Sequence, residues 1–223
     1  FRYPAFELIH NYPVPKFWQS DFWYQWDTLL QEDYDLVVSR TRFFFPSLMA
    51  LWYAHKRSLP LLHIEHGSDF AKFNSRIKTK ISELYDWVLG RLILRSADRV
   101  IGNSQASADF VHKLSGRTDC QVIYRGANIK GIKNIEPRDD LREKYSDKTI
   151  IAFIGRLIDG KGAYDLITAI AQLKRDDIVT FIIGGGPEEE RLKKMTSEYQ
   201  IENQVLFFGN LPFTEAIALL KTA

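Results

Sequence analysis

The sequence is poor in the features that mark secreted, membrane-spanning and nucleic-acid-binding proteins. Its 223 residues include one cysteine, Cys120, so no internal disulfide framework can form and a reduced, cytoplasmic setting is the simplest interpretation. No apolar run approaches the roughly 18 residues that a membrane span needs, and the opening FRYPAFELIH lacks the pattern of a signal peptide. The net charge of +2 is nearly neutral, which argues against nucleic acid as a partner.

The residues that are present predict an α/β protein. Hydrophobic residues make up 45% of the chain, enough for a sizeable core in one large domain or two small ones. Short apolar runs alternate with stretches of helical periodicity, a pattern typical of a parallel sheet with right-handed crossovers. The expected strands are 35–39, 61–65, 99–103, 120–124, 149–154, 179–183 and 205–208. The expected helices are 47–56, 76–96, 104–114, 140–145, 163–174, 188–199 and 214–220.

The composition and periodicity of the sequence change near residue 126, which divides the chain into two parts. Residues 126–148 hold glycines, a proline and many charges with little periodicity, and a second alternating unit follows. We therefore expect an N-terminal domain of residues 1–130, a linker of residues 131–148 and the start of a C-terminal domain at residues 149–223. Three strands are visible in this last part, which is thin for a doubly wound domain.

The most informative motif is IIAFIGRLIDGKG, residues 150–162. An apolar strand ends at Gly155, the cations Arg156 and Lys161 follow, and a helical pattern begins after Gly162. The free N–H groups and positive dipole end of a helix start can hold a phosphate or diphosphate. The motif nearly spells a P-loop, but Gly162 stands where the Mg²⁺-binding Ser or Thr belongs, and no later strand ends in an acidic metal ligand. We therefore favour a phosphate-bearing ligand over a P-loop NTPase and over an ordinary turn with two surface cations.

A glycine cluster follows the next strand, in FIIGGGPEE at residues 181–189. Glycine lets a backbone approach a ligand closely, and the proline and glutamates suit the first turn of a helix. Such a cluster is a weak signal by itself. It gains weight because it falls at the same sheet edge as Gly155, where ligands of open α/β sheets bind.

A third motif, HIEHGSDF, follows the strand 61–65. His63, Glu65 and His66 could suggest a metal site, but His63 and His66 are three residues apart on a strand and point to opposite faces. We therefore expect no metal there and a packed His63. His66, beside a glycine at the ligand-facing edge, is the better candidate for a substrate contact.

Two aromatic regions allow alternative interpretations. The helix 76–96 carries many cations with Tyr85 and Trp87, and it could lie on an anionic membrane surface. We favour a helix with a buried apolar face and a solvated charged face. A second group of aromatic residues could line an acceptor groove or pack in the core. These are Phe17, Trp18, Phe22, Trp23, Tyr24 and Trp26.

Six segments, taken in order, carry a resemblance to a known family. They are HIEHGSD (63–69), ADRVIGNSQASADFV (97–111), VIYRGAN (122–128), FIGRLIDGKGAYDLITAIAQLK (153–174), FIIGGGPEEERLKKM (181–195) and VLFFGNLP (205–212). Together they resemble the GT-B glycosyltransferases, specifically the retaining family 4 group. The resemblance implies two Rossmann-like parallel-sheet domains facing a cleft, both incomplete in this chain. It also implies retaining transfer of a sugar from a nucleotide-sugar donor to a glycan, lipid or small-molecule acceptor, with no bound metal or cofactor.

The same resemblance implies roles for particular residues. Arg156 and Lys161 would hold the donor diphosphate and stabilise the charge that builds on the leaving group, as two fixed cations beside a helix start can do. His66 would reach from the first domain towards the transferred sugar and the phosphate. The glycines after the second strand would let the backbone approach the donor, and Gly209 with Asn210 would lie near the nucleotide base. The implied donor-binding set is Gly155, Arg156, Lys161, Gly184, Gly185, Gly209 and Asn210.

Departures from the family pattern limit what we expect of this chain. The family usually has Asn-Gly where Arg125 and Gly126 stand, and its Glu-x7-Glu loop would follow the helix 214–220. Its first strand and glycine-rich loop would precede Phe1. We therefore expect a fragment of a longer enzyme, with weak or no transferase activity of its own and with peripheral membrane contact as an option. A non-catalytic nucleotide-sugar-binding module, and a GT-B epimerase or phosphorylase, are the alternatives.

Overall fold

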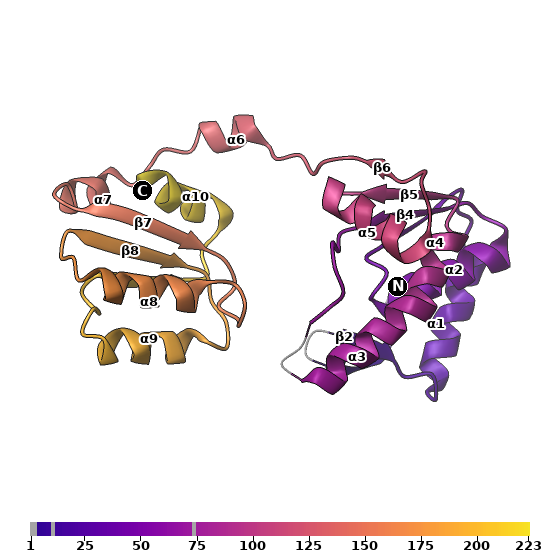
Figure 1. Cartoon of the computed structure of the whole chain (residues 1–223). Helices are drawn as coiled ribbons and strands as arrows, with labels where there is room; N and C mark the ends of the chain where they lie inside the picture. The colour runs from indigo at the N-terminus through magenta and orange to yellow at the C-terminus, as the bar shows by residue number, and fades with distance from the viewer. Residues whose placement is uncertain (1–3, 10–11, 73–74) are drawn as a thin grey trace. The chain divides into compact units, whose positions relative to one another are not determined.

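The computed structural model describes residues 4–9, 12–72 and 75–223, and the chain divides into two compact units, Phe1–Gly126 and Ala127–Ala223 (Figure 1). Each unit has its own parallel sheet, which confirms the predicted α/β class. The predicted linker 131–148 contains most of α6 (Ile129–Lys133) and all of α7 (Asp139–Lys144), and it lies within the second unit.

The N-terminal unit is built on a four-stranded parallel sheet. Its strands lie in the order β3 (Val37–Arg40), β4 (Leu61–Glu65), β5 (Arg99–Gly102) and β6 (Gln121–Val122). All four were predicted, although β6 is shorter than expected. An antiparallel hairpin of β1 (Ala5–Ile9) and β2 (Tyr12–Pro15), which the sequence analysis did not anticipate, precedes the sheet.

Helices cover this sheet and bury its apolar residues. They include α1 (Ser20–Gln31), α2 (Phe45–Arg57) and α5 (Gln105–Ser115). The serine before α5, Ser104, accepts a hydrogen bond from the backbone of Ser107, and the helix ends at Gly116 with a φ of 79°, as helix starts and ends commonly do. The N-terminal aromatic residues were expected either to line an acceptor groove or to pack in the core. Of these, Phe22 and Trp26 are fully buried, whereas Trp18 and Tyr24 are largely exposed.

The helix predicted at 76–96 is interrupted by a π-helical turn. Its parts are α3 (Arg76–Tyr85), the turn η1 (Asp86–Gly90) and α4 (Arg91–Ser96). The wider turn explains the small slips in apolar spacing, because one turn of π-helix shifts the register of a helix face. The expectation of a buried apolar face is wrong for α3: Ile77, Ile81 and Leu84 are exposed, and its buried residue is Ser82.

The C-terminal unit is a three-layer arrangement around the strand β8 (Ile178–Ile183). This strand lies between β7 (Thr149–Ile154) and β9 (Val205–Gly209), and all six of its residues are buried. Helices α8 (Ala163–Leu173) and α9 (Glu189–Glu198) pack with one face of the sheet. Helix α10 (Phe213–Thr222) and α7 pack with the other (Figure 1). The side chains of alternate β8 residues therefore pack in two separate cores, one on each face of the sheet.

Truncation of Ile182, which is fully buried in β8, tests this arrangement. Ile182→Ala should lower the free energy of unfolding of the C-terminal unit by about 2–5 kcal/mol, because it leaves a cavity in a packed core. All five tryptophans lie in the N-terminal unit, at Trp18, Trp23, Trp26, Trp52 and Trp87, so tryptophan fluorescence reports that unit separately. Urea unfolding monitored by circular dichroism should show the lower free energy of unfolding of the C-terminal unit.

The matched control is Leu173→Ala, which truncates an aliphatic side chain that is 53% exposed at the end of α8. We expect a change within about 0.5 kcal/mol for this variant. In Ile182→Ala, the dichroism transition should shift and the fluorescence transition should stay in place. If both transitions shift equally, the two units do not unfold separately.

Candidate functional site

The loops at the carboxyl edge of the C-terminal sheet are joined by backbone hydrogen bonds that continue past the strands. The N–H of Gly155 donates to the carbonyl of Ile183 at 3.0 Å, and that of Leu157 donates to Gly185 at 3.0 Å. On the other side, the N–H of Gly184 donates to the carbonyl of Gly209 at 2.8 Å. The three loops after β7, β8 and β9 are therefore held side by side, at the edge where open α/β sheets bind ligands.

Close packing between these loops requires the glycines of the second one. Gly184 has a φ of 129°, and a Cβ there would lie 2.0 Å from the carbonyl oxygen of Gly155. A Cβ on Gly186 would lie 2.3 Å from the carbonyl oxygen of Leu157. The glycine cluster thus has a structural reason besides the approach of a ligand, since no other residue leaves room for the neighbouring backbone.

Four of the predicted donor-binding residues meet at one small cavity of about 170 Å³. They are Gly155, Arg156, Gly184 and Asn210, and the rest of the lining is apolar. Two more lie beside it: Gly209 bonds to Gly184, and a Cβ on Gly185 would lie 2.8 Å from the Asn210 amide nitrogen. Residues from three loops that are far apart in the sequence are therefore brought together.

Arg156 is the cation of this cavity. The backbone N–H groups of Gly155 and Leu157, on either side of Arg156, donate to the strand and loop beside them. The side chain of Leu157 is fully buried in the core. Because successive side chains of an extended backbone point to opposite faces, a buried Leu157 leaves Arg156 on the open face.

Lys161 lies on the turn that begins α8. The turn is formed by Gly160 and Gly162, with φ values of 78° and 88°. Lys161 is exposed, and in the part of the chain that the structure describes it is not among the residues that line the cavity. Gly162 is the N-cap of α8 and has no side chain to cap it, so the first N–H groups of the helix remain free to meet an anion.

His66 lies in the N-terminal unit, directly after β4, between the ends of two neighbouring strands. The guanidinium of Arg40, at the end of β3, donates to its Nε2 at 3.3 Å, and the amide of Asn103, just after β5, contacts its Nδ1 at 2.9 Å. Burial, and then the charge of Arg40, lower the pKa of His66 below its usual 6.5. The imidazole is therefore neutral at neutral pH, with both ring nitrogens engaged.

Arg40 and Asn103 were not predicted as neighbours of His66 from the sequence. Both residues end or follow strands that pair with β4 in register, Arg40 opposite Ile64 and Gly102 opposite Glu65. Since parallel strands end at one edge, polar residues at the ends of neighbouring strands were the available signal.

A buried ionic cluster supports the turn that carries His66. Arg42, which is 2% exposed, places one guanidinium nitrogen 3.1 Å from a carboxylate oxygen of Glu65 and another 2.8 Å from that of Asp86. The same Glu65 oxygen accepts the backbone N–H groups of His66 at 2.9 Å and Gly67 at 2.6 Å. Glu65 is therefore the link between the ionic cluster and the His66 turn.

The pKa values of the two carboxylates in this cluster are shifted in opposite directions. Burial alone would raise the pKa of Glu65, but the hydrogen bond with His63 and the charge of Arg42 lower it from 4.5 to about 2. Burial raises the pKa of Asp86 in spite of the charge of Arg42. His63 is fully buried and its Nδ1 lies 2.7 Å from the Ser39 hydroxyl, which confirms the expected packed role.

The π-helical turn places Asp86 in the cluster. The turn begins at Asp86 and ends at Gly90, where a Cβ would lie 2.9 Å from a carboxylate oxygen of Asp86. Such turns often occur at functional sites. The slipped apolar spacing of 76–96 was the sequence signal for it.

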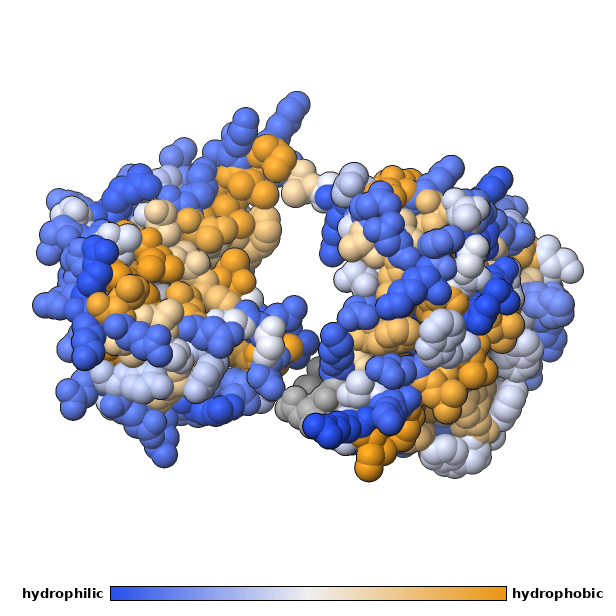
Figure 2. Space-filling model, viewed as in Figure 1, coloured by the Kyte–Doolittle hydropathy of each residue, from blue (hydrophilic) through white to orange (hydrophobic). Residues whose placement is uncertain are grey.

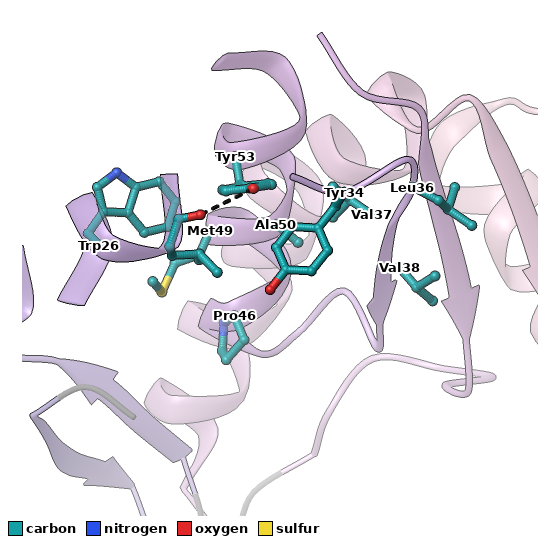
Figure 3. Close-up of a pocket in the computed structure, with 10 residues that line it drawn as sticks. Trp26, Tyr34, Leu36, Val37, Val38, Pro46, Met49, Ala50 and Tyr53 are labelled. Atoms are coloured by element: carbon teal, nitrogen blue, oxygen red, sulfur yellow. Dashed lines mark hydrogen bonds between the residues drawn. The ribbon is translucent and has the colours of Figure 1, made fainter. Parts of the chain in front are cut away.

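An apolar cavity of about 300 Å³ lies elsewhere in the N-terminal unit, between α1, α2 and β3 (Figure 3). Trp26 lines it, and the hydroxyl of Tyr53 donates to the carbonyl of Leu29 beside it at 3.3 Å. Leu36 and Val38, at the outer edge of the sheet, are about half exposed in its wall. Convergent polar groups that would orient a ligand are few here, so we assign it no ligand.

Two family models match the chain. The model described as Glycosyltransferase Family 4 matches residues 2–130, and that described as Glycosyl transferases group 1 matches residues 136–223. The chain belongs to glycosyltransferase family 4. This confirms the family that the six sequence segments indicated.

Two known proteins match the whole chain. An uncharacterized glycosyltransferase of Methanocaldococcus jannaschii is 38% identical over 229 residues, which cover 100% of this chain and 58% of that protein. The alpha-monoglucosyldiacylglycerol synthase of Streptococcus pneumoniae is 23% identical and matches 100% of this chain and 54% of its own. The chain thus spans little more than half the length of these relatives.

The solved structure of Anabaena HepE in complex with UDP has the same fold. It matches 86% of this chain and 53% of its own with a TM-score of 0.66 and 23% identity. The predicted GT-B fold, with two Rossmann-like parallel-sheet units, is thereby confirmed.

The described residues hold neither a clustered metal site nor a membrane-spanning helix. Over residues 4–9, 12–72 and 75–223, no group of three or more His, Cys, Asp or Glu side chains is placed to hold a metal. None of the helices in those ranges is long and apolar enough to cross a bilayer.

Substitution of Gly184 tests the packing of the donor-side loops. Gly184→Ala should lower the free energy of unfolding of the C-terminal unit by about 1–3 kcal/mol or more, because alanine is strained at this φ and its Cβ meets backbone. Circular dichroism during urea unfolding measures the loss. Gly160→Ala is the matched control, because Gly160 lies in the same unit and also has a positive φ, of 78°, but a Cβ there meets nothing within 4 Å, so the transition should shift less. Equal effects of the two substitutions would contradict the packing argument.

Substitution of Glu65 tests the cluster beneath His66. Glu65→Gln should lower the free energy of unfolding of the N-terminal unit by about 3–5 kcal/mol, because it leaves the buried Arg42 with only Asp86 as a counter-charge. Tryptophan fluorescence during urea unfolding gives the measurement. Asp33→Asn, which removes a 98% exposed partner of Arg57, is the control and should leave the transition unchanged.

The pH dependence of stability gives a second measurement on Glu65. Its pKa is about 2 in the folded protein, below the ordinary 4.5, so its contribution is fully present above pH 4.5. That contribution is lost as the pH falls from 4.5 towards 2, because the unfolded state then binds the proton first. In Glu65→Gln this part of the acid destabilisation should disappear, and an unchanged acid profile would contradict the assigned ionisation.

Proposed function

We propose that this protein is the core of a retaining glycosyltransferase that moves a sugar from a nucleotide-sugar donor to a glycan, lipid or small-molecule acceptor. The observation that supports this most is the cavity at the carboxyl edge of β7–β9, where Arg156 lies among residues of three loops. In a chain of glycosyltransferase family 4, a cationic cavity at this edge suits the diphosphate of a nucleotide sugar. The donor is the substrate, and the proposed reaction uses no bound metal or cofactor.

Arg156 and Lys161 are the proposed catalytic cations. Arg156 would contact the diphosphate directly, and Lys161 would meet it beside the free N–H groups of α8. As the sugar leaves, negative charge builds on the departing phosphate, and fixed cations stabilise this charge more than that of the bound donor. The same groups therefore serve binding and catalysis.

The remaining donor-side residues would shape the site around the nucleotide. Gly155, Gly184 and Gly185 give the donor access to backbone that carries no side chain, and Asn210 beside Gly209 offers an amide to the base. We propose His66 as the group that contacts the transferred sugar and the phosphate. A neutral imidazole suits this role because it adds no charge, and the donor would take the place of Arg40 or Asn103 at one of the ring nitrogens.

We further propose that the protein works in the cytoplasm, at the periphery of a membrane. The partly buried, unpaired Cys120 suits a reducing compartment. A relative that covers the whole chain is named for the synthesis of a glucosylated diacylglycerol, which favours a lipid acceptor. No nucleic acid partner is proposed.

A nucleotide-sugar-binding module without transferase activity is the second candidate. It is favoured by the fact that the donor-side residues come together within one unit, so donor binding does not require the rest of a longer enzyme. Transfer of labelled sugar from UDP-, GDP- or ADP-sugars to lipid or glycan extracts separates the two, since a module binds donor and transfers nothing.

Donor binding tests the assignment of the cations. Titration with UDP-, GDP- and ADP-sugars should identify a donor, and Arg156→Ala and Lys161→Ala should each weaken its binding about tenfold or more. A hydrogen bond to a charged group contributes about 1.5–3 kcal/mol, and 1.4 kcal/mol corresponds to a factor of ten. Isothermal calorimetry measures the dissociation constants.

The matched control is Lys194→Ala, which removes a 79% exposed lysine of α9 in the same unit. Its affinity for the donor should equal that of the wild type. If neither Arg156→Ala nor Lys161→Ala weakens binding relative to this control, the diphosphate assignment is wrong.

A further inference from the structure

The carboxyl edge of the N-terminal sheet carries a polar side chain from each of its four strands, and we call these four residues the edge row. They are Arg40 at the end of β3, His66 after β4, Asn103 after β5 and Arg125 in the loop after β6. Pairing continues past the strands: the N–H of Asn103 donates to the carbonyl of Glu65 at 3.1 Å, and that of Ile123 donates to Gly102 at 3.0 Å. The edge row therefore follows the strand order, with an arginine at each end.

Arg40 uses one edge of its guanidinium on the imidazole of His66. Its Nε and one terminal nitrogen both lie 3.3 Å from Nε2 of His66. A guanidinium carries five N–H groups in a fixed fork, so its other terminal nitrogen keeps its hydrogen-bonding capacity. The side chain is exposed, and no acidic partner pairs with it among the residues that the structure describes. Arg40 can therefore meet a ligand at this edge.

Arg125 is the second cation of the edge row and stands where the family usually has asparagine. It is exposed, and within the described part of the chain it too has no ion-pair partner. Burial lowers the pKa of His66, and the charges of Arg40 and then Arg125 lower it further against the opposing charge of Glu65. Both guanidinium groups therefore act on the same imidazole. Hydrophilic residues, blue in Figure 2, lie where the chain leaves the end of β6.

The middle of the edge row is neutral and held in place. The amide nitrogen of Asn103 lies 2.9 Å from Nδ1 of His66, and its carbonyl oxygen accepts from the hydroxyl of the fully buried Ser107 at 2.7 Å. The acidic residues of the His66 loop are engaged elsewhere. Glu65 is buried against Arg42, and Asp69 pairs with a lysine of its own loop at 3.1 Å. The positive charge at the ends of the edge row is therefore available to attract an anion.

We propose that Arg40 and Arg125 bind a phosphate group of the acceptor, next to the hydroxyl that receives the sugar. This inference rests on the proposed function, in which His66 contacts the transferred sugar, so the acceptor must reach the same edge. The donor diphosphate has its own proposed cations, Arg156 and Lys161, in the C-terminal unit. The two arginines of the N-terminal unit are therefore assigned to the other substrate.

The charge count favours phosphate over carboxylate. A phosphate monoester carries about −1.5 to −2 at pH 7, which balances two guanidinium groups, whereas a carboxylate would leave one positive charge unbalanced. The planar fork of arginine also matches two phosphate oxygens at once. Such a phosphate can belong to a soluble polyol or sugar or to a lipid headgroup, and the arginines would meet the same chemical group in both.

Binding of the phosphate would also prepare His66. In the structure, Nε2 of His66 accepts from Arg40. If Arg40 turns towards the acceptor phosphate, Nε2 becomes free for the contact with the transferred sugar. The acceptor would thus release the ring nitrogen that the proposed role of His66 requires.

Calorimetric titration with glycerol phosphate tests the proposal in the 223-residue chain. The donor site would also bind phosphate, so the titration uses a chain that carries Arg156→Ala and Lys161→Ala. This chain should bind glycerol phosphate more tightly than glycerate, and both more tightly than glycerol. Adding Arg40→Gln or Arg125→Asn should weaken the binding of glycerol phosphate about tenfold or more, as loss of a charged hydrogen bond does.

The matched control is Arg99→Gln, which removes an exposed arginine at the start of β5, the opposite edge of the same sheet. Its affinity for glycerol phosphate should equal that of the parent chain. A second titration uses dihexanoyl phosphatidic acid below its critical micelle concentration. Tighter binding of this compound than of glycerol phosphate supports a lipid phosphate, and equal or weaker binding supports a soluble one, provided that both arginines are needed.

Three results would overturn the proposal: no binding of either phosphate compound, equal loss in Arg99→Gln, or glycerate bound as tightly as glycerol phosphate. Donor titration separates it from the proposed function. Arg40→Gln and Arg125→Asn in the otherwise wild-type chain should keep the wild-type donor affinity, and a loss there would assign the arginines to the donor and also overturn the proposal. Glycerol phosphate binding without any donor binding would contradict the proposed function and leave the phosphate site supported.

Discussion

The burial of Arg42 is the constraint on which most of the N-terminal unit depends. A guanidinium that is 2% exposed needs counter-charges, and Glu65 and Asp86 supply them from a strand end and from a helix. The Glu65 carboxylate also holds the backbone of His66 and Gly67, so the turn at the end of β4 has a set geometry. Through Asp86 the same charge decides which face of α3 lies inside. This ion cluster thus influences both the position of His66 and the exposure of the apolar side chains of α3.

The C-terminal unit reaches its site geometry by a different means, the close approach of backbone to backbone. Hydrogen bonds between the loops after β7, β8 and β9 continue the sheet beyond its strands. Gly184 and Gly186 are needed because the loop after β7 passes within contact of their Cα atoms. This packing leaves Arg156 at a shallow cavity with its neighbours immobilised. Because this backbone is held in place, anion binding would cost mainly the rotamer freedom of the exposed Arg156 side chain.

Much of this was predictable from the sequence because the relevant signals are local. Strand and helix periodicity predicted the elements of both sheets, and the glycines with Arg156 marked the carboxyl edge of the second sheet. The ordered motifs predicted the family. His63 was correctly expected to pack. The hairpin β1–β2 was not anticipated, and the neighbours of His66 were missed because Arg40 and Asn103 meet it only through strand pairing.

By itself, the sequence determined the α/β class, the family and the residues that follow each strand, since these depend on periodicity and on motifs contiguous in the chain. Only the tertiary structure decided which face of α3 is buried. Apolar spacing indicates that a helix has a stripe but not which way the stripe points. The pairing of Asp86 with Arg42, 44 residues away in the chain, holds the polar face inside, because its loss would leave the buried guanidinium with Glu65 as its remaining counter-charge.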